Sequence, residues 1–175
     1  LLMMCGSIGC GPIRELTEEL SLRLAPQQEL TVVCGGNEEL HAKLQKRFGD
    51  DRHMHIHGLV DNVPQLMHSA DLFITKPGGL STTEAAACGL PMVLMDTVAG
   101  CEGHNLTFFL QRGGAVTADT PRLLADTAMA LLADPERLWA MSDALRSPDA
   151  QTPAEQIYDC LCRPQTRLDT AQRYA

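Results

Sequence analysis

Short runs of apolar residues alternate with helical stretches along most of the chain. A typical run is apolar at nearly every position, as in the sequence LTVVC over residues 30–34. Strands that are apolar on both faces are typical of a parallel sheet covered by helices on both sides. The predicted strands span residues 1–5, 30–34, 54–57, 71–75, 91–95 and 115–116.

Helices are predicted between these strands, because apolar residues recur there at helical spacing. Ile13, Leu16 and Leu20 share one face of such a helix. Gly89 follows another predicted helix at the position where a left-handed residue ends it. The predicted helices span residues 13–24, 38–48, 63–69, 81–88, 105–112 and 154–161, and after residue 120 the pattern is helical only.

This alternation predicts an α/β fold, a doubly wound and mostly parallel six-stranded sheet with helices on both faces. We expect one domain over residues 1–147, followed by a C-terminal helix and tail over residues 148–175. Because the chain opens directly in a predicted strand, we expect it to be one domain of a longer polypeptide.

Composition narrows the classes of function. The chain has 175 residues, of which 45% are apolar and 21% charged, which is typical of a globular domain. Its net charge of −8 argues against a nucleic-acid partner, and no run of 18 apolar residues predicts a membrane span. Cys5, Cys34 and Cys88 lie among apolar residues and are interpreted as buried hydrophobes in a reducing cytoplasm.

Ligands bind such sheets at the carboxyl ends of the strands, where loops run into helix N-termini. The first such loop, residues 6–11, reads GSIGCG, and its glycines let a ligand approach the backbone. It matches neither the dinucleotide fingerprint nor the Walker A loop. A tight strand-to-helix turn and a binding role both remain open for it.

The second loop, residues 76–91, carries the strongest signal and reads KPGGLSTTEAAACGLP. Two glycines make a tight turn, and Ser81–Thr83 then open a helix with hydroxyls beside free amides. Such an end suits a diphosphate, through N–H donation and the helix dipole. Glu84 either accepts hydrogen bonds from a ribose diol or forms a capping box with Ser81.

Two further segments hold candidate polar groups. In residues 98–105, Glu102 and Asn105 are suited to sugar hydroxyls, or the segment is a solvated loop with Asn105 as a helix cap. Three histidines alternate at positions 53–57 and share one strand face, where they are a candidate metal site. They are His53, His55 and His57, and His57 is the one expected nearest a ligand.

The second loop, preceded by HGLVDNVPQLM and ADLFIT, resembles the C-terminal domain of family 28 glycosyltransferases. Within that family it is most similar to the branch of monogalactosyldiacylglycerol synthases and processive diacylglycerol glucosyltransferases. The resemblance covers about residues 1–132. It implies the Rossmann-like C-terminal half of a GT-B enzyme, which binds a UDP-hexose, while a missing N-terminal domain carries the lipid acceptor site and the general base.

The resemblance also implies roles for individual residues. The backbone of Leu59 and Val60 would meet the uracil, Glu84 the ribose, and Glu102 and Asn105 the donor sugar. The helix start would hold the diphosphate, and the first glycine loop would line the cleft on the diphosphate side. The implied UDP-sugar-binding residues are Gly6, Ser7, Gly9, Leu59, Val60, Gly78, Gly79, Leu80, Ser81, Thr82, Glu84, Glu102 and Asn105.

The sequence thus predicts the donor-binding half of an inverting glycosyltransferase that transfers a hexose to a diacylglycerol-type lipid. We expect no catalytic residue, metal or cofactor in this half, which alone would bind UDP weakly and transfer nothing. The whole protein is expected in the cytoplasm, peripheral to the inner face of the plasma membrane. Cys101 stands where the family has a Gln that helps read the sugar, so the sugar stays open. Two alternatives are a UDP-sugar 2-epimerase-like GT-B domain and a non-catalytic metal-binding module.

Overall fold

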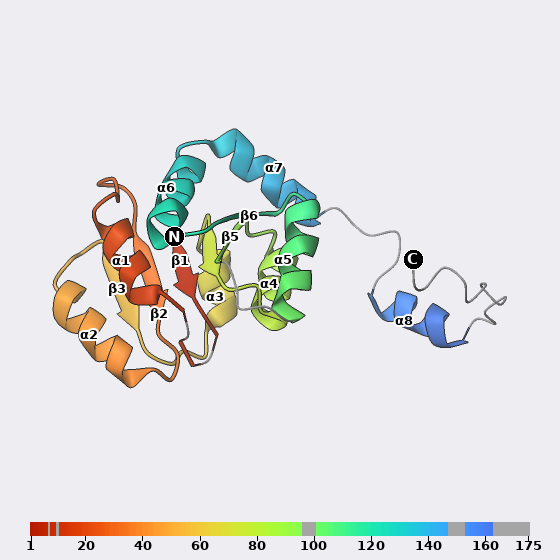
Figure 1. Ribbon diagram of the computed structural model, residues 1–175, viewed down its shortest axis with the longest axis horizontal. Coiled ribbons are helices and arrows are strands. Elements are labelled where there is room, and N and C mark those ends of the chain that lie inside the picture. Colours follow the sequence, from red (N-terminus) through yellow and green to blue (C-terminus); the bar gives the residue numbers. More distant parts are fainter. Residues whose placement is uncertain (7, 10, 96–100, 147–152, 163–175) are drawn as a thin grey trace.

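The computed structural model of the chain has a central sheet between two layers of helices (Figure 1). It describes residues 1–6, 8–9, 11–95, 101–146 and 153–162. The strands are β1 (Leu2–Met4), β2 (Leu30–Val33), β3 (Met54–His57), β4 (Phe73–Thr75), β5 (Met92–Met95) and β6 (Ala115–Ala118). They are all parallel, in the order β3-β2-β1-β4-β5-β6, which confirms the predicted fold class.

Within the described ranges, five helices connect successive strands, and three more follow β6. They are α1 (Ile13–Ser21), α2 (Glu38–Phe48), α3 (Val63–His68), α4 (Gly79–Cys88), α5 (Cys101–Gln111), α6 (Pro121–Leu132), α7 (Pro135–Arg146) and α8 (Pro153–Cys162). No helix in the described part of the chain is both long and apolar enough to cross a bilayer.

Two helices begin earlier than the sequence predicts. α4 starts at Gly79 rather than Ser81, because Gly78 takes the extended backbone of an N-cap residue, with φ −74° and ψ 139°. α5 starts at Cys101 rather than Asn105 and continues through Gly103, a residue that disfavours helices. Both shifts place residues expected in loops at the start of a helix.

Each face of the sheet has its own hydrophobic core. In β1, Met3 points into the core formed with α1, α2 and α6, whereas Leu2 and Met4 point into the core formed with α3, α4 and α5. α7 contributes Met141 to the first core and Leu145 to the second. Burying each side chain of this size stabilises the fold by about 1.5–3 kcal/mol, so the two faces hold the sheet rigid.

The cysteines differ in their surroundings. Cys5 and Cys34 are fully buried, as predicted, and burial raises the pKa of the Cys34 thiol to about 11. Cys88 is only partly buried, which corrects the prediction, because it lies in the last turn of α4 beside the exposed His68. Cys34 is therefore a protonated, unreactive thiol at neutral pH.

The strand order creates a switch point between β1 and β4. From β1 the chain winds outward through β2 to β3, and then returns to β4 on the other side of β1. Loops that leave β1 and β4 therefore diverge at the carboxyl edge of the sheet, the position at which sheets of this kind form their ligand crevice. This is where the glycine loop after β1 and the start of α4 lie.

Candidate functional site

The N-terminal end of α4 is open to a ligand at this crevice. Among the described residues, no side chain caps it. The amides of the first helical residues, Gly79, Leu80 and Ser81, have no intrahelical carbonyl to bond. Gly79 is exposed, and Leu80 is 82% exposed. This end therefore presents N–H donors and the positive pole of the helix dipole outward, as an anion site requires.

Glu84 does not form the capping box that the sequence left open. Ser81 is the third residue of α4 rather than its N-cap, and Glu84 is an exposed residue further along the helix. Because Glu84 follows Ser81 by three positions and Leu80 by four, all three share one helix face. Its carboxylate is thus free of the helix end and lies about one turn beyond the first amides.

The threonines of α4 point differently from the prediction. Thr82 is buried, its hydroxyl donates to the Gly78 carbonyl at 2.7 Å, and its amide donates to the same carbonyl at 3.2 Å. The Thr83 hydroxyl donates to the Gly79 carbonyl at 2.6 Å. Neither hydroxyl lies beside a free amide, and Thr82, expected at the diphosphate, has both donors engaged within the helix.

The glycine loop after β1 has two functions. A β-carbon on Gly9 would lie 2.3 Å from the Cys34 carbonyl oxygen, so this glycine packs the loop against the end of β2. Gly6 faces the crevice, where a β-carbon would lie 3.5 Å from Cε of Lys76. Both have positive φ, 58° and 72°, which favours glycine. Ser7 lies outside the described residues.

An ion pair lies beside the start of α4. Lys76, which follows β4, has its Nζ atom 2.7 Å from Oε1 of Glu102 in the first turn of α5. Asn105 donates from Nδ2 to the Pro77 carbonyl at 2.9 Å, so it is not the helix cap that one hypothesis made it. α5 therefore places both predicted sugar contacts next to the loop that precedes α4. The sequence reasoning missed Lys76, since its partner is 26 positions away.

Leu59 and Val60 follow β3 at the same edge of the sheet. Leu59 is 76% exposed, while Val60 packs partly against the core on the α3 side. The segment they belong to leads into α3, which packs beside α4. The nucleobase contact that the resemblance implies for the backbone of Leu59 and Val60 stays a prediction.

The histidines at β3 have protein partners of their own. His53 bonds the Gln28 carbonyl at 3.1 Å, and Nε2 of His55 lies 3.1 Å from Glu29. Partial loss of solvent lowers the pKa of His57, and the neighbouring His55 and His41 lower it further. Among the residues the structure describes, no three His, Cys, Asp or Glu side chains are grouped as metal ligands.

A hollow of about 580 Å³ lies at the opposite, amino edge of the sheet. It is lined by the end of α4, by the residues that precede β4 and β5, and by Trp139 and Arg146 of α7. The switch-point loops do not reach it. Its polar groups close the end of α4, since Ser142 donates to the Gly89 carbonyl and Arg146 to the Cys88 carbonyl.

The parallel sheet, its switch point and the open helix beside a glycine loop define a Rossmann-like domain of the type that builds GT-B glycosyltransferases. The chain belongs to the family described as "Glycosyl transferases group 1", which it matches over residues 2–134. This confirms the GT-B resemblance that the second loop carries.

Two curated relatives extend this assignment. A processive diacylglycerol beta-glucosyltransferase of Bacillus cereus (strain B4264) is 36% identical over 166 residues, covering 92% of this chain and 42% of the relative. The protein of the same name from Bacillus mycoides (strain KBAB4) is 35% identical over 165 residues, with the same coverage. The chain thus spans about two fifths of the length of these relatives.

Solved structures share the fold at lower identity. The crystal structure of Acinetobacter baumannii MurG is similar with a TM-score of 0.68 and 19% identity, covering 91% of this chain and 49% of that one. The S. aureus MnaA–UDP structure gives a TM-score of 0.64 and 17% identity, covering 82% and 38%. The complex of Anabaena Alr3699/HepE with UDP is similar with a TM-score of 0.64 and 19% identity, covering 83% of this chain and 42% of that one. These likenesses establish the fold.

Proposed function

We propose that this chain is the donor-binding half of an inverting, UDP-sugar-dependent hexosyltransferase that acts on a diacylglycerol-type lipid. The observation that carries the proposal is the uncapped start of α4 at the switch point of the sheet. Two findings support it: the named relatives are diacylglycerol glucosyltransferases, and two of the fold neighbours are complexes with UDP.

The donor fits along α4 in the order of its chemical groups. The diphosphate accepts hydrogen bonds from the amides of Gly79, Leu80 and Ser81, with Gly6 on the far side of the crevice. The ribose hydroxyls donate to Glu84, which lies on the same helix face about 4.5–6 Å further along the axis. The uracil continues toward the backbone of Leu59 and its neighbour Val60.

The hexose lies on the other side of the diphosphate, toward α5. Glu102 and Asn105 come from the first half of that helix, and Asn105 is already held against the loop before α4 by its bond to the Pro77 carbonyl. Asn105 has a free amide oxygen for a sugar hydroxyl, and Glu102 has a carboxylate. Thr82 has no donor left for the diphosphate in this arrangement, and Gly9 serves the turn.

The transfer is a direct displacement. An acceptor hydroxyl oxygen attacks the anomeric carbon, and the bond from this carbon to the β-phosphoryl oxygen breaks. The bonding electron pair leaves with UDP, and the hydroxyl proton passes to a base outside this chain. The growing negative charge on the diphosphate faces the amides and positive dipole of α4, which stabilise it without reorganising.

The lipid acceptor belongs to the part of the enzyme that this chain does not cover. The relatives are more than twice as long as the matched region. The net charge of −8 on the 175 residues disfavours contact of this half with anionic lipids. We place the membrane contact, at the inner face of the plasma membrane, on the remaining half.

The two alternatives have less support. The relatives at 35–36% identity are named as transferases, which favours sugar transfer over 2-epimerisation. The histidines at β3 bond Gln28 and Glu29 rather than converging as metal ligands. The metal-binding alternative gives no role to the uncapped start of α4.

Titration calorimetry of the 175-residue chain with UDP, uridine and buffer tests the proposal. We expect UDP to bind with a dissociation constant below about 1 mM and uridine to bind at least about 10-fold more weakly, because uridine lacks the groups that α4 holds. We expect no glycolipid product from this chain alone. Absence of heat with UDP at millimolar concentration would contradict the proposal.

A further inference from the structure

The ion pair between Lys76 and Glu102 lies across the place where the donor must enter. A β-carbon on Gly78 would lie 3.7 Å from Cε of Lys76 and 3.9 Å from Oε1 of Glu102. Cε of Lys76 also lies 3.5 Å from the corresponding position of Gly6. The pair therefore touches both walls of the crevice at the first residues of α4.

The ion pair between Lys76 and Glu102 is weak enough for Lys76 to exchange Glu102 for another anion. The side chains of Lys76 and Glu102 are 37% and 33% exposed, so solvent screens their attraction, and pairs of this kind contribute little net stability. Lys76 carries its charge on a flexible stem with three rotatable donors. A diphosphate brings at least two negative charges, against one on Glu102, and α4 already favours anions at this position.

We propose that Lys76 is a donor-responsive cation that moves from Glu102 to the diphosphate when the UDP-sugar binds. This inference rests on the proposed function and adds a residue to it. In the absence of donor, Nζ of Lys76 holds the Glu102 carboxylate. In the donor complex, Nζ bonds a β-phosphoryl oxygen, and the released carboxylate accepts hydrogen bonds from hydroxyls of the hexose.

The exchange links two recognition events at one site. The charge of the leaving diphosphate is met by a mobile ammonium group as well as by fixed amides. Glu102 becomes available to the sugar only when a diphosphate has arrived. UDP without a sugar must therefore break the ion pair without gaining the contact with Glu102. Glu102 thus weakens the binding of UDP and favours the binding of UDP-hexose.

Calorimetry with UDP and UMP on four forms of the 175-residue chain tests the exchange: wild type, Lys76→Met, Glu102→Gln and the double variant. We expect Lys76→Met to lower the affinity for UDP about 10-fold and the affinity for UMP about 2-fold or less, because UMP lacks the β-phosphoryl group. We expect Glu102→Gln to raise the affinity for UDP about 2- to 5-fold, because it removes the carboxylate that competes for Lys76. In the double variant this gain disappears.

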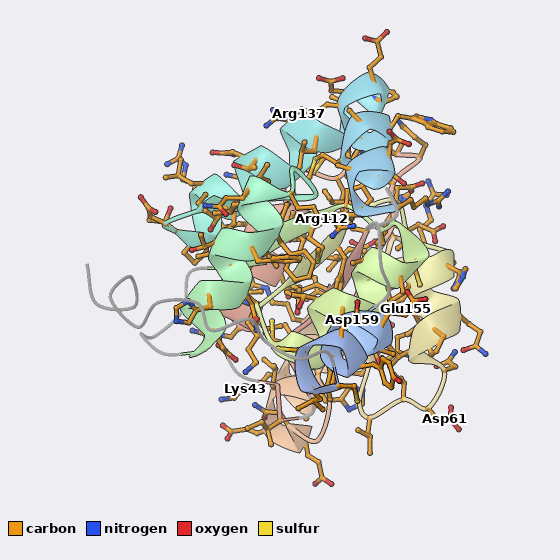
Figure 2. All side chains as sticks on the ribbon, turned by 90° about the vertical axis from the view of Figure 1, so that its right-hand side faces the viewer. Lys43, Asp61, Arg112, Arg137, Glu155 and Asp159 are labelled. Carbon is orange, nitrogen blue, oxygen red and sulfur yellow. The ribbon has the colours of Figure 1, made fainter. Side chains whose placement is uncertain are left out.

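Lys43→Met is the matched control. Lys43 is an exposed lysine of α2 that pairs with Glu39 at 2.6 Å, and its side chain lies at the outer surface of the domain (Figure 2). This variant loses the same charge, so it should bind UDP and UMP as wild type does. Thermal unfolding of each variant reports folding, and Glu102→Gln keeps the test valid should Lys76→Met unfold.

The outcomes separate the two proposals. No UDP binding by the wild type contradicts the proposed function itself. UDP binding that Lys76→Met weakens no more than UMP binding, or that Glu102→Gln weakens, overturns the exchange and leaves the donor site standing. Loss of UDP affinity in Lys76→Met with full recovery in Lys76→Arg supports a role for the charge, since arginine keeps it.

Discussion

The two ends of α4 lie at opposite edges of the same sheet and differ in what closes them. At the C-terminal end, Gly89 is left-handed with φ 66°, Ser142 donates to its carbonyl at 2.6 Å, and Arg146 donates to the Cys88 carbonyl at 3.2 Å. At the N-terminal end, Gly78 provides only an extended backbone, and none of the side chains that the structure describes caps the first amides.

The difference separates structure from function within one helix. At the C-terminal end, the carbonyls of Cys88 and Gly89 accept hydrogen bonds from α7. We propose that the groups at the N-terminal end bind a ligand. A hollow's volume is therefore a poor guide to the site in this domain, and the state of the backbone donors and acceptors is a better one.

The largest expected effect is at the closed end. Replacing Gly89 by Ala puts a β-carbon on a left-handed residue, 2.0 Å from Nε of Arg146, and displaces the side chain that closes the helix. We expect the free energy of unfolding to fall by about 2 kcal/mol, measured by urea denaturation. Gly79→Ala, at the open end, is the control and should leave stability unchanged or slightly raised.

The next effect is on binding at the open end. Glu84→Gln removes a charged acceptor from the ribose but no cap from the helix. We expect UDP affinity to fall about 10-fold by calorimetry, with the free energy of unfolding unchanged within about 0.5 kcal/mol. Glu136→Gln, on an exposed residue of α7, should alter neither. A loss of stability at unchanged UDP affinity would restore the capping interpretation of Glu84.

The smallest expected effect is on the pH dependence of stability, through His57 at the carboxyl edge of the sheet. The pKa of His57 lies below its usual value of 6.5, although its side chain reaches solvent, because nearby protein displaces part of its water and His55 and His41 repel its charge. Between the lowered pKa and 6.5 the unfolded chain binds more protons than the folded one. Lowering the pH through that window therefore destabilises the fold. Above pH 6.5 the contribution of His57 to stability is complete.

His57→Gln removes this contribution. We expect its melting temperature to fall less than that of the wild type between pH 7.5 and pH 5.5, followed by circular dichroism. Equal slopes for the two proteins would show that His57 titrates normally in the folded chain.

The fold was predictable because its signals are local. Runs such as LTVVC predict buried strands, and β3 and α2 have the predicted bounds. The starts of α4 and α5 were not predictable, because glycine is typical of turns. Only the surrounding structure makes Gly78 an N-cap residue and places Gly79 and Gly103 inside helices. Tertiary packing decides those cases.

The candidate site was predictable in part. The glycines after β1 and the segment after β4 were expected at the carboxyl ends of strands, and the strand order brings these two ends to the switch point. The resemblance assigned Thr82 to the diphosphate. In the structure its hydroxyl bonds back to the Gly78 carbonyl, an alternative that the sequence does not distinguish from a hydroxyl turned to a ligand. Lys76 was missed because its partner, Glu102, is brought to it by the approach of α5 to β4, which no local pattern encodes.

The most direct test of the open helix end removes a single amide proton. Proline is accepted at the first position of a helix, and Gly78 already has the extended backbone that a residue before proline adopts, so Gly79→Pro deletes one donor and keeps α4. Gly79→Ala retains the donor and is the matched control, since its β-carbon comes no closer than 3.9 Å to Nδ2 of Asn105. In calorimetry with UDP, Gly79→Pro should bind about 10-fold more weakly than Gly79→Ala, at equal melting temperature. Equal UDP affinity of the two variants would contradict the claim that the amides at the start of α4 hold the diphosphate.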